Sequence, residues 1–271
     1  MKFAHNAVSA IDRLAFSFRL NQARRQFLHS NSDCHETLLG ILEHVRSGTI
    51  SRPERKWWDA IEAERHALYN DSTILQYDDH GAGKPRLFSR KKSATTVSRS
   101  VAELGRSSSP PHEGRLIFSM IRSTKPTTCV ELGTCLGISA AYTLAALSLN
   151  ENGELYSIEG GAAVAAKARE TLTNLGLPAQ GVIHGVFDEQ LQKLLPELGT
   201  VDFVYVDGHH EGPALTNYVD LLLPYLTSGS ILVVDDILWS AGMRRAWKRI
   251  RNYDRVSCSV DLLTFGVCLM K

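Results

Sequence analysis

The sequence predicts an α/β protein with a mostly parallel sheet that ends in an antiparallel hairpin, and two observations support this fold class. After Pro111, short apolar runs of β type alternate with stretches of helical spacing, as in strand–helix–strand units. The last two predicted strands are separated only by Leu262–Thr264, too short a segment for a crossover, so antiparallel pairing is expected. Hydrophobic residues make up 44% of the chain and charged residues 22%, as in ordinary globular proteins.

The elements of this sheet are expected in the second part of the chain. The predicted strands are Thr128–Leu132, Glu154–Ile158, Gly181–His184, Asp202–Asp207, Ser230–Asp235, Val256–Asp261 and Phe265–Met270. The predicted helices are Ile138–Leu149, Ala162–Leu175, Glu189–Leu195, Pro213–Leu226 and Ala241–Arg251. This alternation predicts helices on both faces of the sheet.

The chain of 271 residues divides near residue 110 into an N-terminal extension, residues 1–110, and an α/β domain, residues 111–271. Helical spacing is present at Cys34–Arg46 and Glu54–Tyr69. The segment Asp78–Ser100 is rich in turn-forming residues and ends in a basic, Ser/Thr-rich run, so it is expected to be a loop. We expect the extension to form a lid over the site or a region of homodimerisation.

Composition narrows the class of partner. The formal net charge is +1, and the second part of the chain has no basic, aromatic-rich stretch, so nucleic acid is not an expected partner. The five cysteines form no C-x-x-C pair and are expected to be free thiols in a reducing compartment. No segment has the composition of a signal peptide or a membrane span, so we expect a cytoplasmic protein without membrane contact.

A glycine-rich turn follows the first predicted strand of the sheet. Gly133 allows a tight turn close to a ligand, Gly137 lets the next helix begin there, and Ser139 is expected to cap that helix. Glu131, at the end of the strand, needs a cationic or hydrogen-bonding partner, such as the ammonium of a bound amino acid. Glu159 ends the next strand, where a carboxylate can accept both ribose hydroxyls of a nucleoside. The spacing E-x-G-x-x-x-G differs from the G-x-G-x-x-G of dinucleotide-binding proteins.

The segments VELGTCLGIS and SIEG resemble the first two motifs of class I S-adenosylmethionine (SAM)-dependent methyltransferases. The resemblance is closest to the catechol and caffeoyl-coenzyme A O-methyltransferase group and covers about residues 111–271. It implies a Rossmann-like, seven-stranded sheet whose last strand is antiparallel. The residues expected to bind SAM are Glu131, Gly133, Thr134, Cys135, Gly137, Ser139, Glu159, Gly160, Gly185, Val186, Phe187, Asp207 and His209.

Acidic residues close two further strands of the predicted sheet. Asp207 ends the fourth, and Asp235 and Asp236 end the fifth. Clustered acids repel one another unless protons or a cation neutralise them, and oxygen ligands suit Mg²⁺, with Mn²⁺ or Ca²⁺ as alternatives. The same three positions match the metal ligands of the catechol group, and the resemblance therefore implies a metal site at Asp207, Asp235 and Asp236.

Two departures from that group concern the acceptor site. Asp236 stands where the group usually has Asn, and His210 stands where it commonly has a lysine as general base. The expected mechanism has a metal-bound acceptor hydroxyl of lowered pKa, with Asp207 and His210 as catalytic residues and His210 as the base. His210 as an exposed turn residue is the alternative.

The leading hypothesis is therefore methyl transfer to a hydroxyl of a small molecule. The alternatives are a metal-free methyltransferase acting on nitrogen, sugar or peptide, and a SAM-binding protein without catalysis. An NAD-dependent oxidoreductase would share the topology, but the loop spacing argues against it. The sequence does not identify the acceptor.

Overall fold

The computed structural model describes residues 21–22, 36, 38–43, 50–80, 95–262 and 264–271. Ahead of the main sheet lie α3 (Arg52–Tyr69), β1 (Ile74–Asp79), β2 (Thr95–Ser100), α4 (Val101–Arg106) and α5 (Pro111–Thr124). The alternating part begins with β3 (Thr128–Leu132), α6 (Ile138–Asn150), β4 (Glu154–Glu159), α7 (Ala162–Asn174), β5 (Val182–His184) and α8 (Phe187–Leu198). It ends with β6 (Val201–Val206), α9 (Gly212–Leu222), the 3₁₀ turn η1 (Leu223–Tyr225), β7 (Leu226–Val234), α10 (Ala241–Ile250), β8 (Val256–Leu262) and β9 (Phe265–Met270).

The predicted fold class is confirmed. Seven strands form one sheet in the order β5-β4-β3-β6-β7-β9-β8. The pairings among β5, β4, β3, β6 and β7 are parallel, whereas β9 runs antiparallel to both of its neighbours. The sheet is therefore Rossmann-like, and the short link before β9 produces the expected hairpin.

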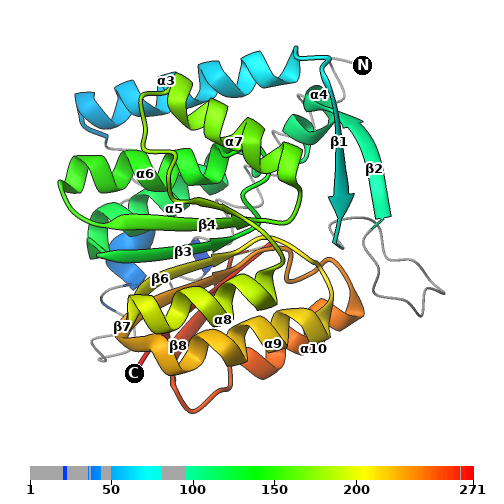
Figure 1. Ribbon diagram of the computed structural model, residues 1–271. Helices are drawn as coiled ribbons and strands as arrows, with labels where there is room; N and C mark the ends of the chain where they lie inside the picture. The colour runs from blue at the N-terminus through cyan, green and yellow to red at the C-terminus, as the bar shows by residue number, and fades with distance from the viewer. Residues whose placement is uncertain (1–20, 23–35, 37, 44–49, 81–94, 263) are drawn as a thin grey trace.

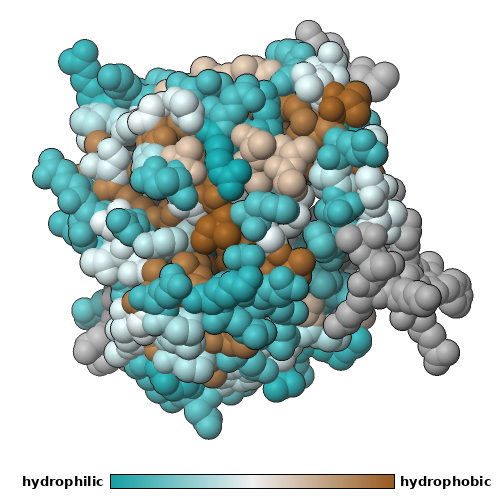
Figure 2. All heavy atoms as spheres, viewed as in Figure 1, coloured by the Kyte–Doolittle hydropathy of each residue, from teal (hydrophilic) through white to brown (hydrophobic). Residues whose placement is uncertain are grey.

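The helices form two layers around this sheet. Figure 1 shows α3, α5, α6 and α7 on one side of the sheet and α8, α9 and α10 on the other. Two groups of buried apolar side chains fill the two interfaces. On the face seen in Figure 2, hydrophilic side chains dominate over α8 and α9, and hydrophobic ones gather near the centre of the view. Among the described helices, none is long and apolar enough to cross a membrane.

The segment expected to be a loop, Asp78–Ser100, is partly strand. Ile74–Asp79 and Thr95–Ser100 pair antiparallel as a two-stranded ribbon, β1–β2. Val97 is the only apolar residue of Thr95–Ser100, so this stretch has no apolar period from which a strand could be predicted. Figure 1 shows the ribbon beside α7 and α4, at the side of the main sheet.

Helix α3 is built as its sequence suggests. Ser51 is the N-cap, its side chain accepts from the Glu54 backbone N–H, and the Glu54 carboxylate accepts from the Ser51 N–H, which completes a capping box. Ile61 and Leu68 on one face of α3 are buried in the same apolar group as α6. Residues 38–43 include further buried apolar side chains, and most of the other residues of the predicted helix Cys34–Arg46 lie outside the described ones.

Candidate active site

The carboxyl ends of β3 and β4 hold the glycine-rich turn. Gly133 and Gly137 have φ angles of 102° and 85°, which residues with a Cβ atom rarely adopt. A Cβ on Gly133 would also collide with the backbone carbonyl of Asp207, because the turns after β3 and β6 are in contact. The glycine-rich turn, predicted to bind the cofactor, and Asp207 are therefore neighbours.

Glu131 is enclosed by hydroxyl groups. Ser157 donates to Glu131 Oε2, and Ser157 Oγ lies 2.5 Å from Thr134 Oγ1. Burial raises the pKa of Glu131 to about 7, although hydrogen bonds from Ser139 and Ser157 oppose the rise. The other carboxylate oxygen, Oε1, is buried without a hydrogen-bond partner among the described residues. An orphaned buried acceptor of this kind matches a cationic donor on a ligand.

The expected capping role of Ser139 is wrong. Gly137 is the N-cap of α6, and this helix has no side-chain cap hydrogen bond. Ser139 lies one residue inside the helix start, and its hydroxyl is directed to Glu131 instead. The serine thus serves the buried carboxylate and not the helix end.

Glu159 joins the two turns at this edge of the sheet. Its carboxylate accepts from the Cys135 N–H at 2.9 Å and from the Gly161 N–H at 2.8 Å. Burial raises its pKa, while these two backbone N–H groups act in the opposite direction. A carboxylate has about four lone-pair positions, so two amides still leave room for ribose hydroxyls.

The region predicted for the adenine lies at the start of α8. Gly185 donates its N–H to the Glu159 carbonyl at 2.9 Å, Val186 is the N-cap of α8, and Phe187 begins the helix. The Phe187 ring packs edge-on against Tyr218, with 5.5 Å between ring centroids. His209 joins this aromatic group, since its Nδ1 lies 2.6 Å from the Tyr218 hydroxyl.

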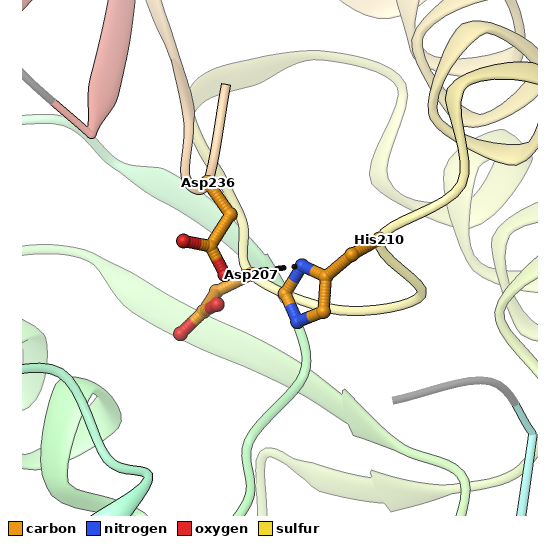
Figure 3. A group of neighbouring side chains, drawn as sticks. All are labelled: Asp207, His210 and Asp236. Carbon is orange, nitrogen blue, oxygen red and sulfur yellow. Dashed lines mark ion pairs between the residues drawn. The ribbon is translucent and has the colours of Figure 1, made fainter. Parts of the chain in front are cut away.

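Two acids and a histidine meet beside the glycine-rich turn. One ligand atom from each of Asp207, His210 and Asp236 can be chosen so that all three lie within 4.8 Å of one another. Figure 3 shows these side chains gathered at one point, from the turns after β6 and β7. His210 Nδ1 lies 3.4 Å from Asp236 Oδ2. Burial raises the pKa of Asp207 to about 7, helped by the charge of Asp236, and burial lowers the pKa of His210.

Asp235, predicted as a metal ligand, is not part of this group. Its Oδ2 accepts from the Tyr205 hydroxyl at 2.7 Å, and its Oδ1 accepts from the Asp236 N–H at 2.6 Å. Burial raises its pKa well above the ordinary value, with the charge of Asp207 adding to the effect. The geometry places His210 at the corner where Asp235 was expected.

Three residues around the acids were not predicted. Ser109 Oγ lies 3.3 Å from Asp207 Oδ2, and Tyr205 OH lies 3.2 Å from the same oxygen. Glu113 on α5 is buried nearby, and its charge also raises the pKa of Asp207. Tyr205 lies two residues before Asp207 and thus on the same face of the strand, a signal the sequence does carry. Nothing in the sequence connects Ser109 or Glu113 with this place.

The rim of this group exposes apolar surface. Leu238 and Trp239 follow the acidic pair and are 49% and 47% exposed, respectively. The His210 and Trp239 rings lie 5.5 Å apart between centroids. An apolar rim beside polar groups is typical of a small-molecule site.

Residues 130–237 match the family model described as a methyltransferase domain. This range contains the glycine-rich turn, Glu159 and the three-residue group of Figure 3. Among curated proteins, tricin synthase 2 of Oryza sativa subsp. japonica is 29% identical over 149 residues, or 50% of this chain. The chain spans about half the length of that relative, 47%.

Solved structures of methyltransferases share the fold. An O-methyltransferase from Bacillus cereus in complex with SAH has a TM-score of 0.54 at 20% identity, covering 63% of this chain and 86% of its own. The SAH-bound methyltransferase of Podospora anserina has a TM-score of 0.56 at 14% identity, covering 89% and 98%. The second likeness extends into residues before 111, since residues 111–271 alone are a smaller share of the chain.

Proposed function

We propose that this chain is a class I SAM-dependent methyltransferase that transfers a methyl group from SAM to a hydroxyl of a small molecule, and the match of residues 130–237 to a methyltransferase domain supports this. The observation that carries the proposal is the contact between the cofactor turn at Gly133 and the backbone of Asp207. It brings the cofactor turn next to the group of acids and histidine.

The groups proposed to bind SAM are the carboxylates at the carboxyl ends of β3 and β4 that can still accept hydrogen bonds. Glu131 Oε1 is a buried acceptor without a partner among the described residues, and the SAM ammonium would supply the missing charge. Glu159 would accept the ribose hydroxyls from its place between the two turns. The turn at Gly185–Phe187 would then border the adenine.

His210 is proposed as the general base. It lies beside both carboxylates, and Asp236 orients its Nδ1 at 3.4 Å. The acceptor hydroxyl gives its proton to the imidazole, its oxygen forms the new C–O bond, and the S–CH₃ bond breaks to leave the neutral thioether of SAH. Most of the rate gain in such a displacement comes from holding the two reactants in line.

Asp207 and Asp236 are proposed to hold a divalent cation beside His210, which stays free as the base. Two carboxylates suit Mg²⁺ or Mn²⁺. A bound cation would lower the pKa of an acceptor hydroxyl. Asp235 would support the site from behind, through its hydrogen bond with the Asp236 N–H.

The exposed rim favours an acceptor with an apolar, planar body. Leu238 and Trp239 lie next to the proposed base and are about half exposed. An aromatic ring carrying neighbouring hydroxyls would cover this surface and present an oxygen to His210. A catechol is therefore the probe of choice.

The test combines binding and turnover. Mn²⁺ is titrated into SAH-saturated protein, and SAH release from SAM is followed with catechol as acceptor. We expect Asp236→Ala to abolish both, whereas Asp254→Ala, at an exposed acid away from the site, should leave both unchanged.

The outcomes separate the alternatives. If the wild type turns over without binding Mn²⁺, the cation is dismissed and the ion pair between His210 and Asp236 remains as a metal-free base. If His210→Ala loses Mn²⁺ affinity as strongly as Asp236→Ala, His210 is a ligand and its role as base is overturned. SAH binding without turnover on any hydroxylated acceptor would favour a binding protein.

A further inference from the structure

We infer that helix α3 helps to position the carboxylate of Asp207 through Arg65 and Ser109. Arg65 and Ser109 are thus positioning residues for the reaction. The inference deepens the proposed function and rests on it. It gives the N-terminal extension a defined part in the site, and the expected role as a lid or a dimer contact stays a prediction.

Arg65 is an unusual side chain for a helix on the outer layer. It is only 2% exposed, and its Nη1 donates to the Ser109 carbonyl at 2.7 Å. Its Nε lies 3.1 Å from the Glu62 carboxylate, which also accepts from the Tyr142 hydroxyl at 2.8 Å. The planar guanidinium is thus held on two sides, so the position of the Ser109 carbonyl is tightly defined.

Ser109 is restrained from its other side as well. Pro110 and Pro111 follow it, and Pro110 is the N-cap of α5 with a φ of −66°. A residue before proline is confined to extended conformations. With its carbonyl bound to Arg65, Ser109 has little freedom left, and its hydroxyl is directed at the acids.

The hydroxyl of Ser109 lies within hydrogen-bond distance of the Asp207 carboxylate. Ser109 Oγ lies 3.3 Å from Asp207 Oδ2 and 3.1 Å from the Tyr205 hydroxyl. Tyr205 has one proton to donate, and its shorter contact, 2.7 Å, is to Asp235. Ser109 is therefore the hydroxyl available to donate to Asp207 Oδ2. Such a contact fixes the rotation of the carboxylate and hence the direction of its other oxygen.

Groups that orient a ligand or a base in this way have large effects, about 10- to 100-fold on metal affinity or activity. A merely structural role for Arg65 would instead change the free energy of unfolding and leave the folded site intact. A positioning role and a structural role therefore predict different Mn²⁺ affinities for the folded variants.

The experiment uses the full chain with Ser109→Ala, Arg65→Met and the double variant. Arg115→Met is the matched control. Arg115 also belongs to the contact between the extension and α5, since its guanidinium carbon lies 4.7 Å from the centroid of the Trp58 ring, and among the described residues it makes no hydrogen bond to Ser109. For each variant we measure Mn²⁺ affinity in the presence of SAH, SAH affinity, kcat with catechol and the melting temperature.

We expect Ser109→Ala to lower Mn²⁺ affinity and kcat by about tenfold or more, with SAH affinity unchanged. Arg65→Met should act in the same direction, and Arg65→Lys should recover part of the loss. If Arg65 acts through Ser109, the double variant should resemble Ser109→Ala, because the two effects are not independent. Arg115→Met should retain both values.

Additive losses in the double variant would overturn the relay, and so would a Ser109→Ala protein equal to the wild type. Ser109→Ala keeps the test decisive even if Arg65→Met fails to fold. A wild type that neither binds Mn²⁺ nor methylates catechol would remove the proposed function and the relay together. A wild type that does both, with an unaffected Ser109→Ala variant, would remove the relay alone.

Discussion

Glu131 lies wholly inside the protein, and its surroundings leave one oxygen without a partner among the described residues. Burial raises the pKa of the carboxyl from 4.5 to about 7, so near neutral pH it is poised between its two forms. A cationic ligand would favour the ionised form. With Glu131 as the proposed partner of the SAM ammonium, SAM binding is expected to depend on pH.

The first prediction is that SAH binding near pH 7 releases a proton from Glu131, so that affinity rises between about pH 6 and pH 8. Calorimetry in buffers of different ionisation enthalpy measures this proton. Glu131→Gln should lose the dependence and bind at least roughly tenfold more weakly, since a charge-assisted hydrogen bond is worth about 1.5–3 kcal/mol. Identical pH profiles for variant and wild type would contradict the assignment.

The same shift affects the stability of the free protein. A carboxyl whose pKa is raised on folding contributes stability that is present below its ordinary pKa of 4.5 and is lost as pH rises through about 7. Glu131→Gln should therefore be less sensitive to this pH range than the wild type in urea denaturation.

At the scale of elements, the β1–β2 ribbon packs on the turn that carries Glu159. A Cβ on Gly161 would lie 2.8 Å from a ring carbon of Tyr77. A Cβ on Gly160 would lie 2.9 Å from a ring carbon of His80. Two adjacent glycines therefore permit the ribbon to lie directly on this turn. The ribbon thus supports the proposed ribose-binding carboxylate from outside the main sheet.

We predict that Tyr77→Ala weakens SAH binding about fivefold to tenfold, because the turn after β4 loses its cover and gains freedom before binding. Gln76→Ala, at the exposed neighbouring position of β1, is the control and should bind as the wild type does. The measurement is SAH titration by calorimetry. Equal affinity for the two variants would show that the ribbon does not contribute.

At the scale of the whole molecule, α3 shares one apolar core with the helices on its side of the sheet. Every residue of α6 over Ile138–Leu147 is buried, whereas a helix that packed only on the sheet would expose its outer face. Ile61 of α3, fully buried, belongs to the same group. The extension is therefore expected to contribute to the cooperative unfolding of the protein.

Ile61→Ala should lower the free energy of unfolding by about 2–5 kcal/mol, the usual range for a large-to-alanine change in a core. Ile74→Ala, at a position 63% exposed, should change it by less than about 0.5 kcal/mol. Urea denaturation of the full chain measures both. A variant at Ile61 as stable as the control would show that α3 is not part of the core.

The expected residues of the cofactor turn and of the acidic pair were visible in the sequence because they follow buried strands directly. Strand ends share one edge of a parallel sheet, so Glu131, Glu159, Asp207 and Asp236 could be brought together from their order alone. The main sheet could be predicted because its strands are apolar runs that alternate with stretches of helical spacing. Strand β2 has a single apolar residue, Val97, and no such period, so it was missed.

What the sequence by itself determined is the fold class, the glycine-rich turn after the first strand of the main sheet and the edge of the sheet where the acids gather, because each depends on local pattern and on strand order. Only the tertiary structure decided which side chains face one another there. It turned Asp235 toward Tyr205, brought His210 to Asp236, and placed Ser109 and Arg65 behind Asp207. These contacts join residues far apart in the chain through rotamers and helix placement, which no local pattern encodes.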